Sequence, residues 1–406
     1  MSIFRVVSSD SPESRQHLFA AALALLIAGL GLAAALVYSH QLEGRYIHAL
    51  APELSEEKLH GMALQREAFA QPDLLVLYGS SELVQDLPSN ATHFFADYPT
   101  GFRVFPVGKQ GTTSLSVLQK IASMGDDVRG RKLAYSISPG FFLTDAIDPK
   151  YYAGNFSALQ AGEVLFGSGL SRELRRDIAD RMLDFPDTLS DHWLLGTAAE
   201  RLVGDTALDR VLYAAVLPLG KLQNLIGRAQ DHLGTATHIL EEDEKLNPAP
   251  RRGLRALNWS ELFRRGAQLA NNAQIQAKRN HVAARRIPKA SRDRALMATI
   301  GRAREWQDLE LLMRTLTELE AKPLLLTMPI EDIRLEALGA SSASRNLLLT
   351  RLDALADEYS FPLVDFREHQ RDVTFLVDFS DHLSGKGWIH YNKALDDFFH
   401  GRLRRL

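Results

Sequence analysis

The Leu18–Tyr38 segment constrains this chain most, because it runs for 21 residues without a charged side chain. As a helix it would be about 31 Å long, enough to cross the hydrocarbon core of a bilayer. Arg5, Arg15 and His17 precede it, whereas the two charges that follow it, at positions 43 and 45, cancel. Since basic residues remain on the cytoplasmic side, we expect residues 1–17 to be a cytoplasmic tail and the chain after residue 38 to be extracytoplasmic.

A cleaved signal peptide is the alternative, since Ala33-Ala34-Ala35 could serve a peptidase. The apolar run is longer than the hydrophobic region of a usual signal peptide, and we therefore favour an uncleaved transmembrane anchor over residues 18–38. Residues 39–72 would then form a polar, helical stalk. Residues 73–406 would form a domain tethered to the outer face of the cell membrane by this single pass.

The composition narrows the function classes. With 46% apolar and 24% charged residues among 406, the chain has the make-up of a folded globular protein. A net charge of −3 argues against a protein built to hold nucleic acid. The absence of cysteine from the sequence excludes disulfides, thiolate metal sites and a cysteine nucleophile.

Short apolar runs that alternate with helical segments predict an α/β domain. Continuous apolar runs of this length are typical of strands buried on both faces of a parallel sheet. Helical periodicity replaces them from about residue 156 to 320, which we interpret as a large helical insertion in one domain. The expected strands are Leu74–Tyr78, Phe102–Val107, Leu133–Ser138, Pro323–Thr327 and Phe361–Asp365.

The first expected strand ends at Gly79-Ser80-Ser81, which places a hydroxyl at the carboxyl end of the sheet. Open α/β sheets bind their ligands at this edge. The hydroxyl is either a nucleophile or the cap of an ordinary strand-to-helix turn. The second strand leads into Gly108–Ser114, a glycine-rich turn in which the lysine lacks the spacing of a phosphate loop, so we expect no nucleotide site there.

The last loop before the carboxyl-terminal helix supplies an imidazole beside carboxylates. It contains Asp378, Asp381 and His382. A histidine is a base near neutral pH, and a neighbouring acid holds its tautomer and stabilises the imidazolium, so this loop offers the partners that a nucleophilic serine needs. Adjacent side chains usually point apart, and we therefore favour Asp378 over Asp381 as the acid that orients His382.

The order of these motifs resembles that of the SGNH (GDSL-like) hydrolase and acyltransferase superfamily. A Gly-x-Ser unit follows the first strand, a glycine in a Thr- and Ser-rich turn follows the second, and an Asp and a His precede the final helix. The resemblance implies a three-layer fold with a mainly parallel sheet. It also implies that Ser81 is the nucleophile, that His382 is its base, and that the backbone amides of Ser81 and Gly111 form the oxyanion hole.

More closely, the chain resembles the DltD family of D-alanyl lipoteichoic acid biosynthesis. The shared features are the amino-terminal anchor, the long helical insertion, and the motifs Gly79-Ser80-Ser81-Glu82-Leu83, Ser138-Pro139, His382-Leu383-Ser384-Gly385-Lys386-Gly387-Trp388 and Tyr391-Asn392-Lys393-Ala394. Gly140 and Phe141 stand where the family usually has Gln-Trp, so a side-chain oxyanion donor from that loop is not expected. Phe379 stands where the superfamily usually has its acid.

The resemblance implies a membrane-anchored serine acyltransferase that attaches D-alanine to hydroxyls of an anionic, teichoic-acid-like polymer of the cell envelope. The implied partners are a DltB-like membrane-bound O-acyltransferase and, indirectly, a DltC-like D-alanyl carrier protein, with no cofactor and no metal. Two alternatives remain: an extracytoplasmic SGNH esterase or thioesterase, and a non-catalytic partner of the membrane-bound O-acyltransferase.

Overall fold

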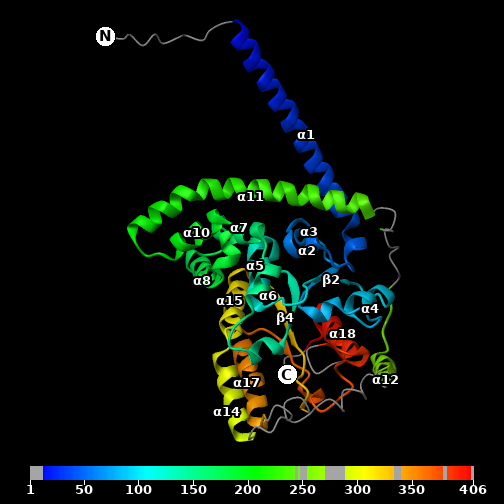
Figure 1. Ribbon diagram of the computed structural model, residues 1–406. Helices are drawn as coiled ribbons and strands as arrows, with labels where there is room; N and C mark the ends of the chain where they lie inside the picture. Colours follow the sequence, from blue (N-terminus) through cyan, green and yellow to red (C-terminus); the bar gives the residue numbers. More distant parts are fainter. Residues whose placement is uncertain are drawn as a thin grey trace.

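A parallel sheet lies at the centre of the molecule (Figure 1). The computed structural model describes residues 12–242, 246, 254–269, 289–332, 340–377 and 382–403. The strand order within the described residues is β2-β1-β3-β4-β5, and each neighbouring pair is parallel. The bounds are β1 (Leu74–Tyr78), β2 (Arg103–Val107), β3 (Lys132–Ile137), β4 (Lys322–Thr327) and β5 (Leu363–Val364). The expected α/β class is confirmed, although β5 is shorter than its apolar run suggested.

Helices connect and cover the strands. Those before the insertion are α1 (Pro12–Leu50), α2 (Glu56–His60), α3 (Ala63–Ala70), α4 (Ala91–Asp97) and α5 (Ser114–Met124). Those from the insertion onward are α6 (Pro149–Asn155), α7 (Ala158–Phe166), α8 (Arg172–Leu183), α9 (Pro186–Ser190), α10 (Trp193–Val203), α11 (Ala207–Glu242), α12 (Trp259–Leu269), α14 (Lys289–Arg302), α15 (Glu305–Glu318), α17 (Ser342–Glu358) and α18 (Gly385–Phe399). The short 3₁₀ helices are η1 (Ser81–Val84), η2 (Gly125–Val128), η3 (Pro139–Leu143) and η4 (Arg367–His369).

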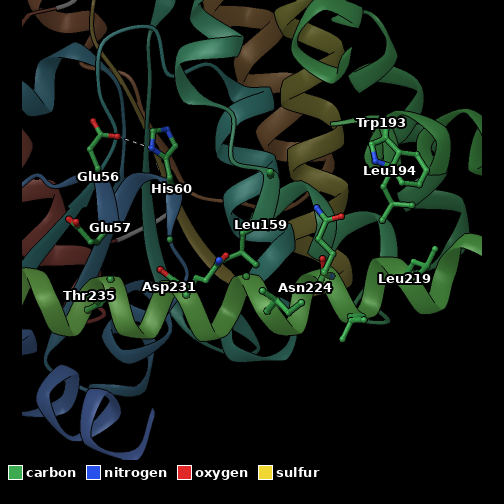
Figure 2. A pocket seen from close by; sticks show the side chains of 18 residues that line it. Glu56, Glu57, His60, Leu159, Trp193, Leu194, Leu219, Asn224, Asp231 and Thr235 are labelled. Atoms are coloured by element: carbon green, nitrogen blue, oxygen red, sulfur yellow. Dashed lines mark ion pairs between the residues drawn. The ribbon is translucent and has the colours of Figure 1, made fainter. Parts of the chain in front are cut away.

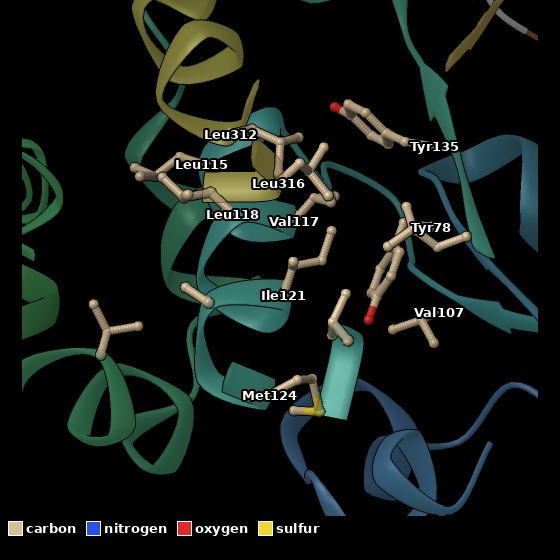
Figure 3. Packing of buried hydrophobic residues seen from close by; sticks show 14 of the residues in the cluster. Tyr78, Val107, Leu115, Val117, Leu118, Ile121, Met124, Tyr135, Leu312 and Leu316 are labelled. Carbon is tan, nitrogen blue, oxygen red and sulfur yellow. The ribbon is translucent and has the colours of Figure 1, made fainter. Parts of the chain in front are cut away.

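Alternation along β1 explains why helices cover both faces of the sheet. Successive strand residues point to opposite faces, so Val76 and Tyr78 pack in one apolar cluster and Leu75 and Leu77 in another. The first cluster includes the apolar residues of α5 and α15 (Figure 3), and the second those of α4 and α18. The result is the three-layer arrangement expected for the SGNH-like fold.

The stretch expected as a stalk packs against the domain. The helix α1 continues without a break from the apolar run to Leu50, and Ile47 and Leu50 are buried in the first cluster. Leu64 and Phe69 of α3 are buried there as well. These apolar residues of the expected polar stalk therefore belong to the core, which extends back to about residue 42.

Within the helical insertion, a buried ion pair joins α8 to α15, the helix that packs in the first cluster beside the sheet. Arg181 of α8 donates through Nε to Asp308 Oδ1 of α15 at 2.7 Å and through Nη2 to Oδ2 at 3.1 Å. The two side chains are 3% and 0% exposed. A carboxylate taken out of water is costly unless it is paired, so Asp308 depends on this guanidinium.

Arg181→Ala is expected to destabilise the fold by about 3–5 kcal/mol, because it leaves Asp308 buried without its cation. Arg176→Ala is the matched control, since Arg176 pairs with Asp205 at the surface, where such pairs contribute about 1 kcal/mol or less. Denaturant unfolding of the purified full chain measures both free energies. An equal loss of unfolding free energy in the two variants would show that the buried pair stabilises the fold no more than a surface pair does.

The start of α5 is held by another carboxyl group. This helix follows the glycine-rich turn after β2. Glu305 Oε1 accepts a hydrogen bond from the Ser114 amide at 2.9 Å, and the Ser114 hydroxyl lies 2.9 Å from the Tyr135 hydroxyl. Burial, reinforced by the negative charge of Asp308, raises the pKa of Glu305 to about 8. Glu305 therefore retains its proton at neutral pH in the folded chain.

Glu305→Gln is expected to remove a pH-dependent loss of stability. Between the ordinary carboxyl pKa of 4.5 and about 8, the unfolded chain has released the Glu305 proton while the folded chain holds it, so stability falls as pH rises through this window. One pKa unit corresponds to about 1.4 kcal/mol, so the wild type should lose a few kcal/mol relative to the glutamine variant between about pH 5 and 8.5. Unfolding curves measured across this range provide the test. Parallel pH dependences in the two proteins would refute the assignment.

Candidate active site

The turn after β1 holds Ser81 at the carboxyl edge of the sheet. Ser81 is the first residue of η1. The Ser80 amide donates to Glu82 Oε1 at 3.0 Å, and the Glu82 side chain is fully buried beneath the turn. A Cβ on Gly79 would lie 2.3 Å from the same Glu82 oxygen, so only glycine fits there without displacing that carboxylate.

The turn after β1 and the turn after β2 are in direct contact. The Gly79 amide donates to the Val107 carbonyl at 3.2 Å, and the Ser80 hydroxyl donates to the Lys109 carbonyl at 3.4 Å. A Cβ on Gly108 would lie 1.9 Å from the Gly79 carbonyl oxygen, which excludes any side chain at that position. Glycine is therefore required at position 108 by the close approach of the two backbones.

The structure brings Ser81 and His382 together across 301 residues of sequence: Ser81 Oγ lies 2.8 Å from His382 Nε2. The described residues on either side of His382 and its loop are held by hydrogen bonds. The Val377 amide donates to the His382 carbonyl at 2.8 Å. Ser384 accepts the Gly387 amide at 3.2 Å as the N-cap of α18 and donates its hydroxyl to the Thr374 carbonyl at 2.6 Å.

Asp378 and Asp381, the two candidate acids, lie outside the residues that the structure describes. The choice between them as the partner of His382 therefore stays a prediction. Within the described parts of the chain, no group of three His, Asp or Glu side chains is arranged to hold a metal ion.

Gly111 adopts a conformation that favours glycine. Its φ is +80°, and a Cβ there would lie 2.3 Å from Cδ1 of the Tyr151 ring. The surrounding turn is held by Asn155, the last residue of α6, which donates to the Gln110 carbonyl at 3.4 Å and the Tyr151 carbonyl at 2.9 Å. The Thr112 hydroxyl, in turn, donates to Asn155 Oδ1 at 2.7 Å.

Asn155 and Tyr151 were missed by the sequence reasoning, which placed them at the edge of the helical insertion. No sequence pattern links either residue to Gly111. The sequence carries no signal for this role, because the burial of Asn155 is known only from the structure. A polar side chain that is 3% exposed must bond to some partner. That partner is the second loop of the site, so Asn155 acts on the site by positioning Gln110 and Thr112.

The third loop, η3, contributes aromatic side chains. Phe142 is buried against Trp306 with ring centroids 4.3 Å apart, and Phe141 meets Tyr151 edge-on at 6.0 Å. Phe141 thus stands where the DltD motif usually has an aromatic residue. It packs on Tyr151, the residue that covers Gly111. Gly140 and Phe141 carry no side-chain hydrogen-bond donor, as the sequence indicated.

Two buried hydroxyls, those of Tyr391 and Ser136, are bonded to each other near Glu82. The Tyr391 hydroxyl donates to the Ser136 hydroxyl at 2.7 Å. Burial, together with the negative charge of Glu82, raises the pKa of Tyr391 well above its ordinary value. The phenol stays protonated and acts as a hydrogen-bond donor to Ser136 of β3.

The sequence matches the family model described as DltD protein over residues 51–400. The chain belongs to the DltD family. Protein DltD of Bacillus subtilis (strain 168) is 24% identical over 355 residues, 86% of this chain and 88% of the relative. Protein DltD of Staphylococcus aureus (strain NCTC 8325 / PS 47) is 21% identical, covering 84% and 85%, and Protein DltD of Lacticaseibacillus rhamnosus is 22% identical, covering 87% and 83%.

This membership confirms the family that the sequence motifs indicated. DltD proteins are involved in the D-alanylation of teichoic acids. The match spans the sheet, the helical insertion and the carboxyl-terminal helix of this DltD-family chain, so the resemblance extends well beyond the motifs around Ser81 and His382.

Ser81 is expected to react with a serine-directed fluorophosphonate, since its hydroxyl lies within hydrogen-bond distance of an imidazole. Ser81→Ala and His382→Ala should abolish labelling, because the first removes the nucleophile and the second its base. Ser80→Ala is the matched control: that hydroxyl bonds a backbone carbonyl, and its loss should leave the label in place. In-gel fluorescence reports the result, and labelling of the Ser81 variant would show that another residue reacts.

Proposed function

We propose that this chain is a serine acyltransferase that transfers D-alanine to hydroxyls of an anionic cell-envelope polymer through an acyl-serine intermediate. One observation carries the proposal, the 2.8 Å contact between Ser81 Oγ and His382 Nε2 at the carboxyl edge of the sheet. Family membership supports the acyl group and the class of acceptor.

In the first half-reaction His382 Nε2 accepts the Ser81 proton as Oγ attacks the carbonyl carbon of an activated D-alanyl donor. The new bond joins Oγ to the carbonyl carbon, and the bond from that carbon to the leaving group breaks. The imidazolium returns its proton to the leaving group. The chain then carries D-alanine as an ester of Ser81.

In the second half-reaction His382 takes the proton from a polymer hydroxyl, whose oxygen attacks the Ser81 ester. The acyl bond to Oγ breaks, and the imidazolium gives its proton back to Oγ. The amides of Ser81 and Gly111 are the proposed donors to the oxyanion in both halves, each contributing about 3–4 kcal/mol to the transition state. The contact between the two glycine turns and the hold of Asn155 on Gln110 support this role.

The proposed site lies outside the cell. The helix α1 is apolar and long enough to cross a membrane, and the most apolar part of it is not buried against the rest of the chain. With the basic residues before the span, this supports a cytoplasmic amino terminus and an extracytoplasmic domain. The activated donor would therefore reach Ser81 from a DltB-like membrane-bound O-acyltransferase, itself supplied by a DltC-like carrier protein.

In cells that depend on this chain, Ser81→Ala is expected to abolish ester-linked D-alanine in the envelope polymer while the level of the protein is unchanged. Ser80→Ala should preserve the ester. Base-released D-alanine is measured by chromatography and protein by immunoblot. Unchanged D-alanine in the Ser81 variant would refute the acyl-serine pathway and leave the chain as a non-catalytic partner.

Turnover of a model ester by the purified chain separates transfer from hydrolysis. An acyltransferase should be accelerated by added polymer and should form the polymer ester, because the acceptor hydroxyl replaces water in the second half-reaction. Turnover that no acceptor stimulates would identify an esterase or thioesterase instead.

A further inference from the structure

The helix α11 exposes a continuous apolar face to solvent. Leu208 is 64% exposed, Leu222 52% and Ile226 51%, although leucine and isoleucine are normally buried. The exposed apolar residues recur three, four, seven or eight positions apart, which places them on one side of the helix. The larger members are Leu208, Val211, Leu219, Leu222, Leu225 and Ile226, and we call this set the apolar face.

The opposite face of α11 is firmly docked on the domain, so the apolar face is not a core surface turned outward. Gly220 fits so closely that a Cβ there would lie 2.3 Å from the Phe166 ring. Asn224 and Ile239 are buried, and the Asp231 carboxylate accepts the amides of Met62 and Ala63 at 2.7 and 2.8 Å. These contacts fix which side of the helix points away from the protein.

The charges beside the apolar face are basic. Arg210 and Lys221 are exposed. Two acidic residues of this helix are turned inward: Asp209 is bound by Arg201 at 2.9 Å, and Asp231 caps the start of α3 as described above. Glu241 is exposed but lies at the carboxyl-terminal end of α11, beyond the apolar face. A helix with an apolar face and basic flanks is typical of segments that lie in the interface of an anionic membrane.

The position of α11 relative to α1 identifies what covers this face. Figure 1 shows α11 lying across the side of the domain from which α1 leaves, transverse to it. The two helices are joined by His232 Nδ1 and Glu43 Oε1, 2.7 Å apart. Glu43 comes five residues after Tyr38, or about 7.5 Å along the helix axis, so α11 crosses α1 just where its apolar span ends.

We propose that α11 lies in the plane of the membrane, with its apolar face inserted into the outer leaflet. The inference rests on the anchoring of α1 in the proposed function. A helix is about 10 Å across, so an axis about 7.5 Å below the end of the apolar span places the outward-pointing side chains at the lipid interface. The chain is thus held at the membrane by two elements that cross one another.

A groove beside α11 extends this contact toward the active site (Figure 2). It has a volume of about 680 Å³, and Leu219, Leu222 and Trp193 line it. Trp193 is 68% exposed, and tryptophan favours the membrane interface. Glu56, at the other end of the lining, pairs with Lys109 at 3.6 Å, and Lys109 belongs to the turn that accepts the Ser80 hydroxyl.

Because the sequence has no cysteine, single labels can be placed in the full chain. Three variants carry a nitroxide in vesicles of phosphatidylcholine and phosphatidylglycerol: Leu222→Cys on the apolar face, Leu26→Cys in the expected span of α1, and Ala354→Cys, exposed on α17 away from α11. Power-saturation measurements compare the accessibility of each label to oxygen, which concentrates in lipid, and to a water-soluble nickel chelate.

The label at position 222 is expected to show a several-fold higher ratio of oxygen to nickel accessibility than the label at 354, approaching that at 26. A ratio equal to that at 354 would overturn the proposal. Shielding of position 222 from both reagents would also overturn it, since protein would then cover the face. A water-accessible label at position 26 would instead refute the anchoring by α1 on which the proposal rests.

Discussion

The structure of the site depends on one contact between two backbone turns. The carbonyl oxygen of Gly79 occupies the place where a side chain of Gly108 would begin, so the ends of β1 and β2 approach as closely as backbone atoms allow. This approach follows from the parallel pairing of the two strands, whose register continues as a hydrogen bond from Gly79 to Val107. Ser81 projects from the first turn and Gly111 belongs to the second. A side chain at Gly108 would separate Ser81 from the loop proposed to stabilise the oxyanion.

The sheet and the Ser81–His382 pair could be foreseen because their causes are local or topological. Strands buried on both faces must be continuous apolar runs, and the Leu74–Tyr78 run is such a strand at the predicted residues. The carboxyl ends of parallel strands meet at one edge, so a histidine in the last loop and a serine after the first strand can meet across most of the chain. Whether Asp378 orients that histidine stays a prediction, since it lies outside the described residues.

Other features of the structure depend on contacts between residues that are far apart in the sequence, and no local sequence pattern indicates such contacts. The apolar residues of α3 were interpreted as part of a polar stalk because their neighbours are charged, yet Leu64 and Phe69 are buried against the sheet. Asn155 binds Gln110, which lies 45 residues earlier in the chain, and no sequence pattern links the two positions. Likewise no local pattern marks the end of α11 at Glu242, because its last turns are stabilised by the burial of Ala236 and Ile239 in the core.

The continuity of α1 has a mechanical consequence. The helix passes from its apolar segment into the core without a break, and Ile47 and Leu50 are as deeply buried as residues of the sheet. In the proposed topology the domain has no hinge at the membrane, so the distance from the lipid surface to Ser81 is constant. Such a chain works at one depth of the cell envelope. In the proposed acyl transfer, each acceptor unit of a long polymer would have to move past a stationary Ser81, so the number of units that react would depend on how far the polymer can bend towards that depth.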